Sequence, residues 1–139
     1  DCLLSRGLGD VYKRQEVTVS HFFNNMPELY AGTHLIISRA GASSVSEIAA
    51  VGIPSILVPL PIAADDHQTA NAREIGDAKA GIVLKQKDFT PARLGELLKE
   101  LMSSPKKLSQ MSENAKSVGI TDAAVRFADA VEKEILSRP

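Results

Sequence analysis

The chain has 139 residues, enough for one domain, and is 44% hydrophobic, 24% charged and only 4% aromatic. This apolar content excludes a disordered polar chain, and the formal net charge of −1 argues against a nucleic-acid partner, which needs clustered, uncompensated lysine and arginine. The single cysteine, Cys2, excludes an internal disulfide, a zinc cluster and an iron–sulfur site.

The first fifteen residues, DCLLSRGLGDVYKRQ, show neither helical nor strand periodicity. Their last six, Asp10 to Gln15, resemble the translated end of a transposon used in sequencing libraries. We therefore predict that residues 1–15 are a non-native sequencing scar and that residues 16–139 are part of one domain. An irregular native N-terminus is the alternative. A scar would also imply that the chain is a fragment of a longer protein.

From residue 16 onward, short apolar runs alternate with amphipathic stretches. Gly52 and Pro54 are typical of a helix end and predict where one of these stretches stops. In chain order, we expect a strand over 16–22, a short helix over 24–31, a buried strand over 34–38, a helix over 44–51, a second buried strand over 55–60, a helix over 66–75 and a third strand over 81–84.

Three further helices are expected in the last third of the chain. Thr90 followed by Pro91 is typical of a helix start, with threonine as the N-cap and proline at the first helical position. Ser104 followed by Pro105 repeats this pattern. We therefore expect helices that end near residues 102 and 117.

The last expected helix starts at Thr121 and Asp122 and ends near residue 136. Its apolar residues Ala124, Phe127, Ala128 and Val131 recur at helical spacing. Because such a stripe usually faces a core, we expect one face of this helix to pack.

Strands that alternate with helices predict an α/β fold, a Rossmann-like parallel sheet with flanking helices. The runs HLIIS and SILVPL are apolar on both faces, as expected for strands covered by helices on each side. Three or four strands make a thin sheet, which again suggests part of a larger domain.

The stretch SRAGASSVSE, residues 38–47, lies where a strand turns into a helix. In open α/β sheets, ligands bind at the carboxyl ends of the strands. Gly41 would allow a tight turn and close approach of a ligand to the backbone, and the helix N-terminus suits an anion such as a diphosphate. Ser43 and Ser44 add hydroxyl donors.

Glu47 has two interpretations. Ser44 and Glu47 form the S-x-x-E pattern of a capping box, in which the glutamate caps its own helix. Alternatively, the carboxylate accepts hydrogen bonds from two vicinal hydroxyls of a nucleotide ribose. Spacing alone favours the cap.

The stretch PLPIAADDHQTANA, residues 59–72, also follows a strand and opens a helix, so it should lie at the same edge of the sheet. Gln68 and Asn71 are three residues apart and share a helix face, where amides can bind sugar hydroxyls.

Asp65, Asp66 and His67 could suggest a metal site. However, adjacent residues on a helix point apart, and the sequence offers no second ligand cluster, so we expect no metal. The simpler interpretation is that Asp66 is an N-cap and His67 an exposed residue at the helix start.

Together, SRAGASSVSEIAAVGIPSILVPLP and DDHQTANA resemble the C-terminal domain of the MurG family. This family transfers N-acetylglucosamine (GlcNAc) from UDP-GlcNAc to the 4-hydroxyl of N-acetylmuramic acid (MurNAc) in lipid I, and so makes lipid II for peptidoglycan. The resemblance implies a GT-B fold, in which this chain is part of the C-terminal, donor-binding domain. It also shifts the interpretation of Glu47 toward ribose binding, which is compatible with a cap.

The resemblance implies several site residues. The matching glutamate binds the ribose, the matching glutamine binds GlcNAc, and a residue before the first helix binds uracil through its backbone. The substrate-binding residues would be Phe23, Ala42, Ser43, Ser44, Val45, Ser46, Glu47 and Gln68. Weaker candidates are Gly41, His67, Arg39 and Asn71, of which Arg39 and Asn71 are expected to support the loops.

The implied reaction is inverting and uses no metal and no cofactor, since UDP-GlcNAc is a substrate. The catalytic base and the site for lipid I would belong to a missing N-terminal domain, so we expect this chain alone to be inactive. The resemblance places the parent protein at the cytoplasmic face of the bacterial membrane, as a peripheral protein.

Three alternatives remain at the level of the sequence. The first is another GT-B transferase that uses a UDP-sugar to make a glycolipid. The second is a non-catalytic module that binds nucleotide-sugars. The third is an α/β domain with capped helices and no ligand, which accounts for each motif singly but not for both at one sheet edge.

Overall fold

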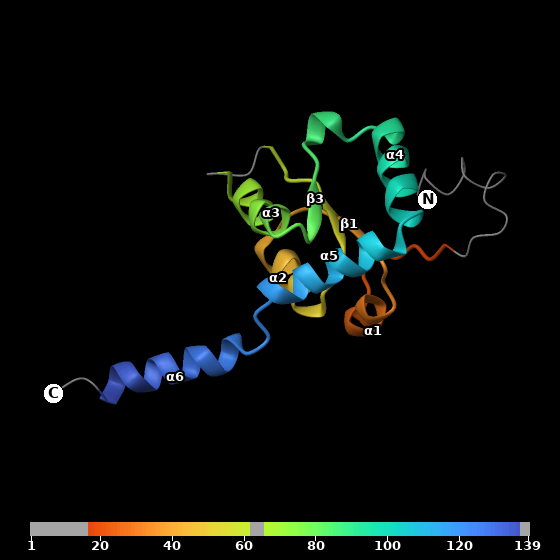
Figure 1. The fold of residues 1–139 in the computed structure, drawn as a ribbon. Helices are drawn as coiled ribbons and strands as arrows, with labels where there is room; N and C mark the ends of the chain where they lie inside the picture. Colours follow the sequence, from red (N-terminus) through yellow and green to blue (C-terminus); the bar gives the residue numbers. More distant parts are fainter. Residues whose placement is uncertain (1–16, 62–65, 137–139) are drawn as a thin grey trace.

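The computed structural model describes residues 17–61 and 66–136. Its centre is a parallel sheet of three short strands in the order β1-β2-β3 (Figure 1). The strands are β1 (Ile36–Ser38), β2 (Ser55–Leu57) and β3 (Gly81–Val83). The helices are α1 (Met26–Ala31), α2 (Ala42–Val51), α3 (His67–Asp77), α4 (Pro91–Met102), α5 (Pro105–Val118) and α6 (Ala123–Leu136), with a 3-10 turn, η2 (Gln86–Asp88), before α4. The expected Rossmann-like sheet with flanking helices is confirmed.

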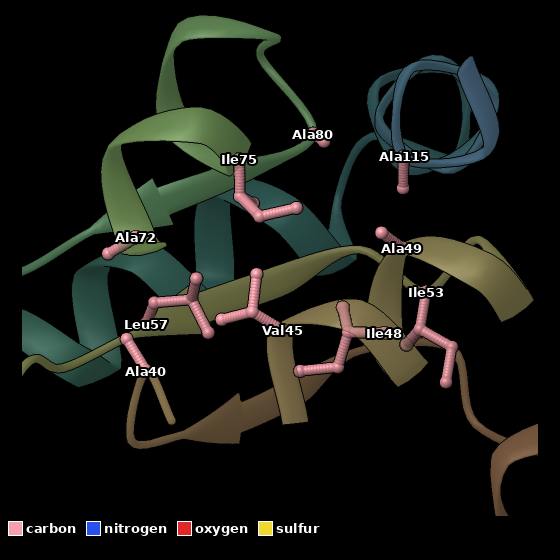
Figure 2. Close-up of a cluster of buried hydrophobic side chains, with 10 residues drawn as sticks. All are labelled: Ala40, Val45, Ile48, Ala49, Ile53, Leu57, Ala72, Ile75, Ala80 and Ala115. Carbon is pink, nitrogen blue, oxygen red and sulfur yellow. The ribbon is translucent and has the colours of Figure 1, made fainter. Parts of the chain in front are cut away.

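The core has two parts because successive residues of β2 point to opposite faces of the sheet. Leu57 belongs to a cluster with the buried sides of α2 and α3 and with Ala115 of α5. Figure 2 shows Val45 of α2 and Ile75 of α3 among the side chains of this cluster. Ile56 belongs to the other cluster, which includes Leu97 and Leu101 of α4. Helices therefore cover both faces of β2, as its apolar sequence predicts.

Helix α2 ends where the sequence predicts. Gly52 adopts the left-handed conformation, with φ 83°, which a residue with a side chain rarely adopts. The Gly52 amide donates to the Ala49 carbonyl, and the Ile53 amide donates to the Ile48 carbonyl at 3.0 Å. This pair of hydrogen bonds is a Schellman motif, so the chain turns sharply from α2 toward β2.

The prediction of a strand over 16–22 is wrong for the part that the structure describes, because residues 17–22 are irregular. Val17 and Val19 are 73% and 72% exposed, and no strand among the described residues pairs with them. The alternating pattern is present, but a strand also needs a neighbour to satisfy its backbone groups.

The three observed strands are shorter than predicted. The strand expected over 34–38 begins only at Ile36 and is half-buried, because β1 lies at the edge of the sheet that the described residues form, and Ile37 is 41% exposed. The strands expected over 55–60 and 81–84 end at Leu57 and Val83.

The helices of the last third are confirmed within a few residues. Thr90 caps α4 as predicted, because its hydroxyl accepts a hydrogen bond from the Arg93 amide at 3.2 Å. Ser104 precedes α5 but forms no side-chain cap.

The expectation that the last helix packs is wrong. Helix α6 has no buried residue, and Phe127 is 73% exposed. Figure 1 shows α6 extending away from the sheet and the other helices. Its apolar stripe therefore meets no partner within the described ranges. None of the helices in these ranges is long and apolar enough to cross a membrane.

Candidate functional site

The two sequence motifs meet at the carboxyl edge of the sheet, as predicted. Strands β1 and β2 are adjacent and parallel, so the loop into α2 and the loop into α3 leave the sheet on the same side. Asn71 of α3 donates a hydrogen bond from Nδ2 to the Ala40 carbonyl at 3.0 Å. This bond joins the second motif directly to the first.

Arg39 also joins elements at this edge. One of its guanidinium nitrogens, Nη1, donates to the Val58 carbonyl at 3.1 Å and to Oε1 of Gln86. Arg39 therefore links the ends of β1 and β2 to the turn η2. Arg39 and Asn71 thus each donate to a backbone carbonyl at this edge, and their expected role in supporting the loops of a donor site stays a prediction.

The N-terminus of α2 is open to a ligand. The first helical hydrogen bond runs from the Val45 amide to the Gly41 carbonyl, so the amides of Ala42, Ser43 and Ser44 have no acceptor within the helix. Ala42 and Ser43 are exposed. Unpaired amides at the positive end of a helix dipole can bind an anion.

Gly41 contributes space rather than an unusual backbone conformation. Its φ of −65° and ψ of 148° are available to any residue, so the expected glycine-dependent tight turn is wrong. A Cβ atom at this position would meet only the Ser44 hydroxyl, at 3.9 Å. The backbone beside Gly41 is therefore open, which leaves room for a ligand to approach.

The prediction that Ser44 and Glu47 form a capping box is also wrong. Helix α2 begins at Ala42, two residues before the predicted start, and its N-cap is Gly41, which forms no side-chain cap. Glu47 consequently lies in the second turn, beyond the amides that need a cap. Its exposed carboxylate instead accepts a hydrogen bond from the Tyr30 hydroxyl, with 3.0 Å between Oη and Oε2.

Tyr30 is the residue that sequence reasoning missed. It lies near the end of α1, and its side chain packs against the cluster that contains Val45 and Ile48. Burial raises the pKa of the Tyr30 phenol, and the hydrogen bond to Glu47 and the charge of Glu47 raise it further. The phenol therefore stays protonated at neutral pH. No local pattern links two residues seventeen positions apart, so only the packing of α1 on α2 reveals this pair.

The other expected residues of α2 divide between two faces. Ser43, Ser46 and Glu47 are exposed, and Ser44 is half-buried. The Val45 side chain is buried in the core cluster. Ser43 and Glu47 are four residues apart, so the exposed face of α2 carries a hydroxyl and a carboxylate in line with the open N-terminus.

The start of α3 brings Gln68 to the end of β2. Oε1 of Gln68 accepts a hydrogen bond from the Leu60 amide at 2.9 Å, so the side chain holds the loop that follows β2. Asp66 occupies the N-cap position in the left-handed conformation, with φ 54°, and forms no side-chain cap. His67 is the exposed first residue of α3, as expected.

Phe23 stands apart from this group. It is half-buried in the irregular segment before α1, and no hydrogen bond joins it to another of the described residues. Its expected contact with a base remains a prediction. Asp65, part of the possible metal cluster, lies outside the described residues. In the two described ranges, no three His, Cys, Asp or Glu side chains gather as a metal site would require.

Residues 6–127 match the glycosyltransferase family 28 C-terminal domain. Similar curated proteins carry the name UDP-N-acetylglucosamine–N-acetylmuramyl-(pentapeptide) pyrophosphoryl-undecaprenol N-acetylglucosamine transferase. The protein from Granulibacter bethesdensis is 46% identical over 120 residues, which cover 86% of this chain and 31% of that protein. The protein from Rhodospirillum rubrum is 47% identical over 116 residues, which cover 84% of this chain and 30% of that protein.

A solved structure agrees with these matches. The crystal structure of Acinetobacter baumannii MurG is similar with a TM-score of 0.83 and 36% sequence identity, over 90% of this chain and 36% of that chain. The chain thus spans about a third of the length of the relatives that it matches.

Proposed function

The chain belongs to the glycosyltransferase family 28 C-terminal domain family, and from this we propose that it binds the nucleotide-sugar donor of a MurG-type transferase. The proposed donor is UDP-GlcNAc. The observation that carries the proposal is that α2 has an open N-terminus and that the exposed Glu47 carboxylate lies farther along the same helix.

The two groups suit two parts of the donor. The unpaired amides of Ala42, Ser43 and Ser44 would bind the diphosphate, because they lie at the positive end of the helix dipole. Glu47 lies five residues beyond Ala42, about 7.5 Å along the helix axis. Its carboxylate would accept hydrogen bonds from the ribose hydroxyls, which are charge-assisted and therefore strong.

Gln68 would contribute to sugar binding through its amide nitrogen. Its oxygen already accepts from Leu60, whereas Nε2 forms no hydrogen bond among the described residues. An amide N–H group can donate to a hydroxyl of GlcNAc. The bond to Leu60 would hold the amide in place for this contact.

The proposed reaction is inverting transfer of GlcNAc to the MurNAc 4-hydroxyl of lipid I, without a cofactor. The helix N-terminus of α2 would stabilise the charge of the departing UDP. The general base and the lipid I site would come from the part of the relatives that this chain does not match. The chain alone would then bind the donor without transferring it, and the whole transferase would act peripherally at the cytoplasmic membrane face.

Calorimetric titration of the chain with UDP-GlcNAc tests this proposal. Glu47→Ala should weaken binding about 10- to 100-fold, because hydrogen bonds to a charged group contribute about 1.5–3 kcal/mol. Glu132→Ala changes an exposed helical glutamate on α6 and should leave binding unchanged.

UDP-glucose and UDP-galactose, titrated alongside, separate this transferase from other UDP-sugar enzymes. We expect weaker binding of both, since neither carries the N-acetyl group. No binding of any of the three by the folded chain, or equal binding by wild type and Glu47→Ala, would count against the proposal.

A further inference from the structure

We propose that Tyr30 is a positioning residue that holds the Glu47 carboxylate in the orientation that accepts the ribose hydroxyls. This inference rests on the proposed function, because it assigns Tyr30 a role in the same donor site. It concerns a residue of α1, which neither of the two sequence motifs includes.

The first argument is geometric. The ring of Tyr30 packs against the buried cluster shared by α2 and the sheet, so the side chain is anchored on one side. Its hydroxyl, at the other end of the ring, donates to Oε2 of Glu47 at 3.0 Å. Because packing holds the Tyr30 ring in place, the hydrogen bond from its hydroxyl also restricts the position of the exposed Glu47 carboxylate.

The second argument concerns conformational freedom. Glu47 is exposed on α2, where a glutamate with no partner would sample several rotamers and lose this freedom when a ligand binds. The bond from Tyr30 restricts the carboxylate before the ligand arrives. Such preorganisation reduces the entropic cost of binding.

The third argument concerns which oxygen remains available. The Tyr30 hydroxyl has one proton and donates it to Oε2, so Oε1 and the remaining lone pairs of Oε2 can accept from a ribose. The phenol stays protonated at neutral pH, because burial and the neighbouring Glu47 both disfavour its ionisation. The donor is therefore present under ordinary conditions.

The test measures binding of UDP and of 2′-deoxy-UDP to the whole chain by calorimetry. The variants are Tyr30→Phe, Glu47→Ala and the double variant. Tyr30→Phe keeps the packed ring and removes only the hydroxyl. Thr33→Val is the matched control, since it removes a nearby hydroxyl that donates to the Leu29 carbonyl and has no bond to Glu47.

We expect Tyr30→Phe to weaken UDP binding about three- to tenfold and to reduce the preference for UDP over 2′-deoxy-UDP. In the Glu47→Ala background, Tyr30→Phe should have no further effect, because a positioning residue acts only through its partner. Thr33→Val should bind both nucleotides as the wild type does. If Tyr30 has a purely structural role, Tyr30→Phe should weaken the binding of UDP and of 2′-deoxy-UDP equally and should lower the urea midpoint of unfolding.

Besides the result expected of a purely structural role, two outcomes overturn the inference in distinguishable ways. If Glu47→Ala binds UDP as the wild type does, the assignment of Glu47 fails and the role of Tyr30 fails with it. If Glu47→Ala weakens binding while Tyr30→Phe keeps both the affinity and the ribose preference, only the inference about Tyr30 is overturned.

Discussion

At the scale of single residues, Ser55 is an exception within the core. It is fully buried in β2, and its hydroxyl has no hydrogen-bond partner among the described residues. A buried hydroxyl without a partner lowers stability, since it has lost its hydrogen bonds to water. Ser112 provides the contrast, because its hydroxyl donates to the Gly52 carbonyl at 2.7 Å.

We therefore predict that Ser55→Ala raises the free energy of unfolding by about 1 kcal/mol. Ser112→Ala should lower it by about 1–2 kcal/mol, because the buried Gly52 carbonyl loses its partner. Urea unfolding followed by circular dichroism measures both, which suits a chain without tryptophan. A lower stability of Ser55→Ala would indicate that the hydroxyl has a partner in solution, such as a buried water.

At the scale of elements, two helices begin with the same pattern and differ in their caps. Thr90 precedes Pro91 at the start of α4, and its hydroxyl accepts from the Arg93 amide. Ser104 precedes Pro105 at the start of α5, where the backbone angles differ and no side-chain cap forms. An N-cap contributes only when its oxygen reaches a free amide of the first turn.

Thr90→Ala should consequently destabilise the protein by about 1 kcal/mol, whereas Ser104→Ala should cost only a few tenths of that amount. The comparison is informative because both helices bury residues in the same core cluster, Leu97 on α4 and Met111 on α5. Chemical denaturation of the two variants side by side provides the measurement. Equal losses would show that the Ser104 hydroxyl also caps its helix in solution.

At the scale of the whole molecule, α6 contributes nothing to the core. Every one of its residues is exposed, and its apolar stripe, which includes Phe127 and Ile135, meets no other element in the described part of the chain. Because hydrophobic stabilisation is proportional to the apolar area removed from water, a helix that buries none adds little to stability.

A chain that ends at Asp122 should therefore unfold at the same urea concentration as the full chain, with a free energy changed by less than about 0.5 kcal/mol. Its helical circular dichroism signal should fall, since the fourteen residues of α6 are lost. A clearly lower urea midpoint would show that α6 packs against the rest of the chain in solution.

Much of the fold could be predicted from the sequence because its signals are local. The start of α4 and the end of α2 depend on residues within one helical turn, Thr90 with Pro91 and Gly52 with Ile53. The parallel arrangement follows from strands that alternate with helices. Because adjacent parallel strands end at the same edge of a sheet, the prediction that both motifs lie at one edge is confirmed.

Predictions from the sequence are wrong where a local pattern fits more than one structure, or where the structure it predicts needs a partner far away in the chain. The S-x-x-E pattern predicted a cap, but α2 begins at Ala42, and Glu47 is then too far from the helix start. The alternating residues 17–22 form no strand, and the apolar stripe of α6 is exposed, because no partner among the described residues covers either one.

Apart from the strand wrongly expected over 16–22, the sequence by itself determined which segments form the helices and the three strands of the sheet, and it identified the two motifs that meet at the sheet edge. Only the tertiary structure decided that α1 packs on α2, that Tyr30 reaches Glu47, and that Asn71 bonds to Ala40. The physical reason is range. Periodicity and turn chemistry act over a few residues, whereas a hydrogen bond between residues seventeen or thirty-one positions apart exists only after the chain has folded.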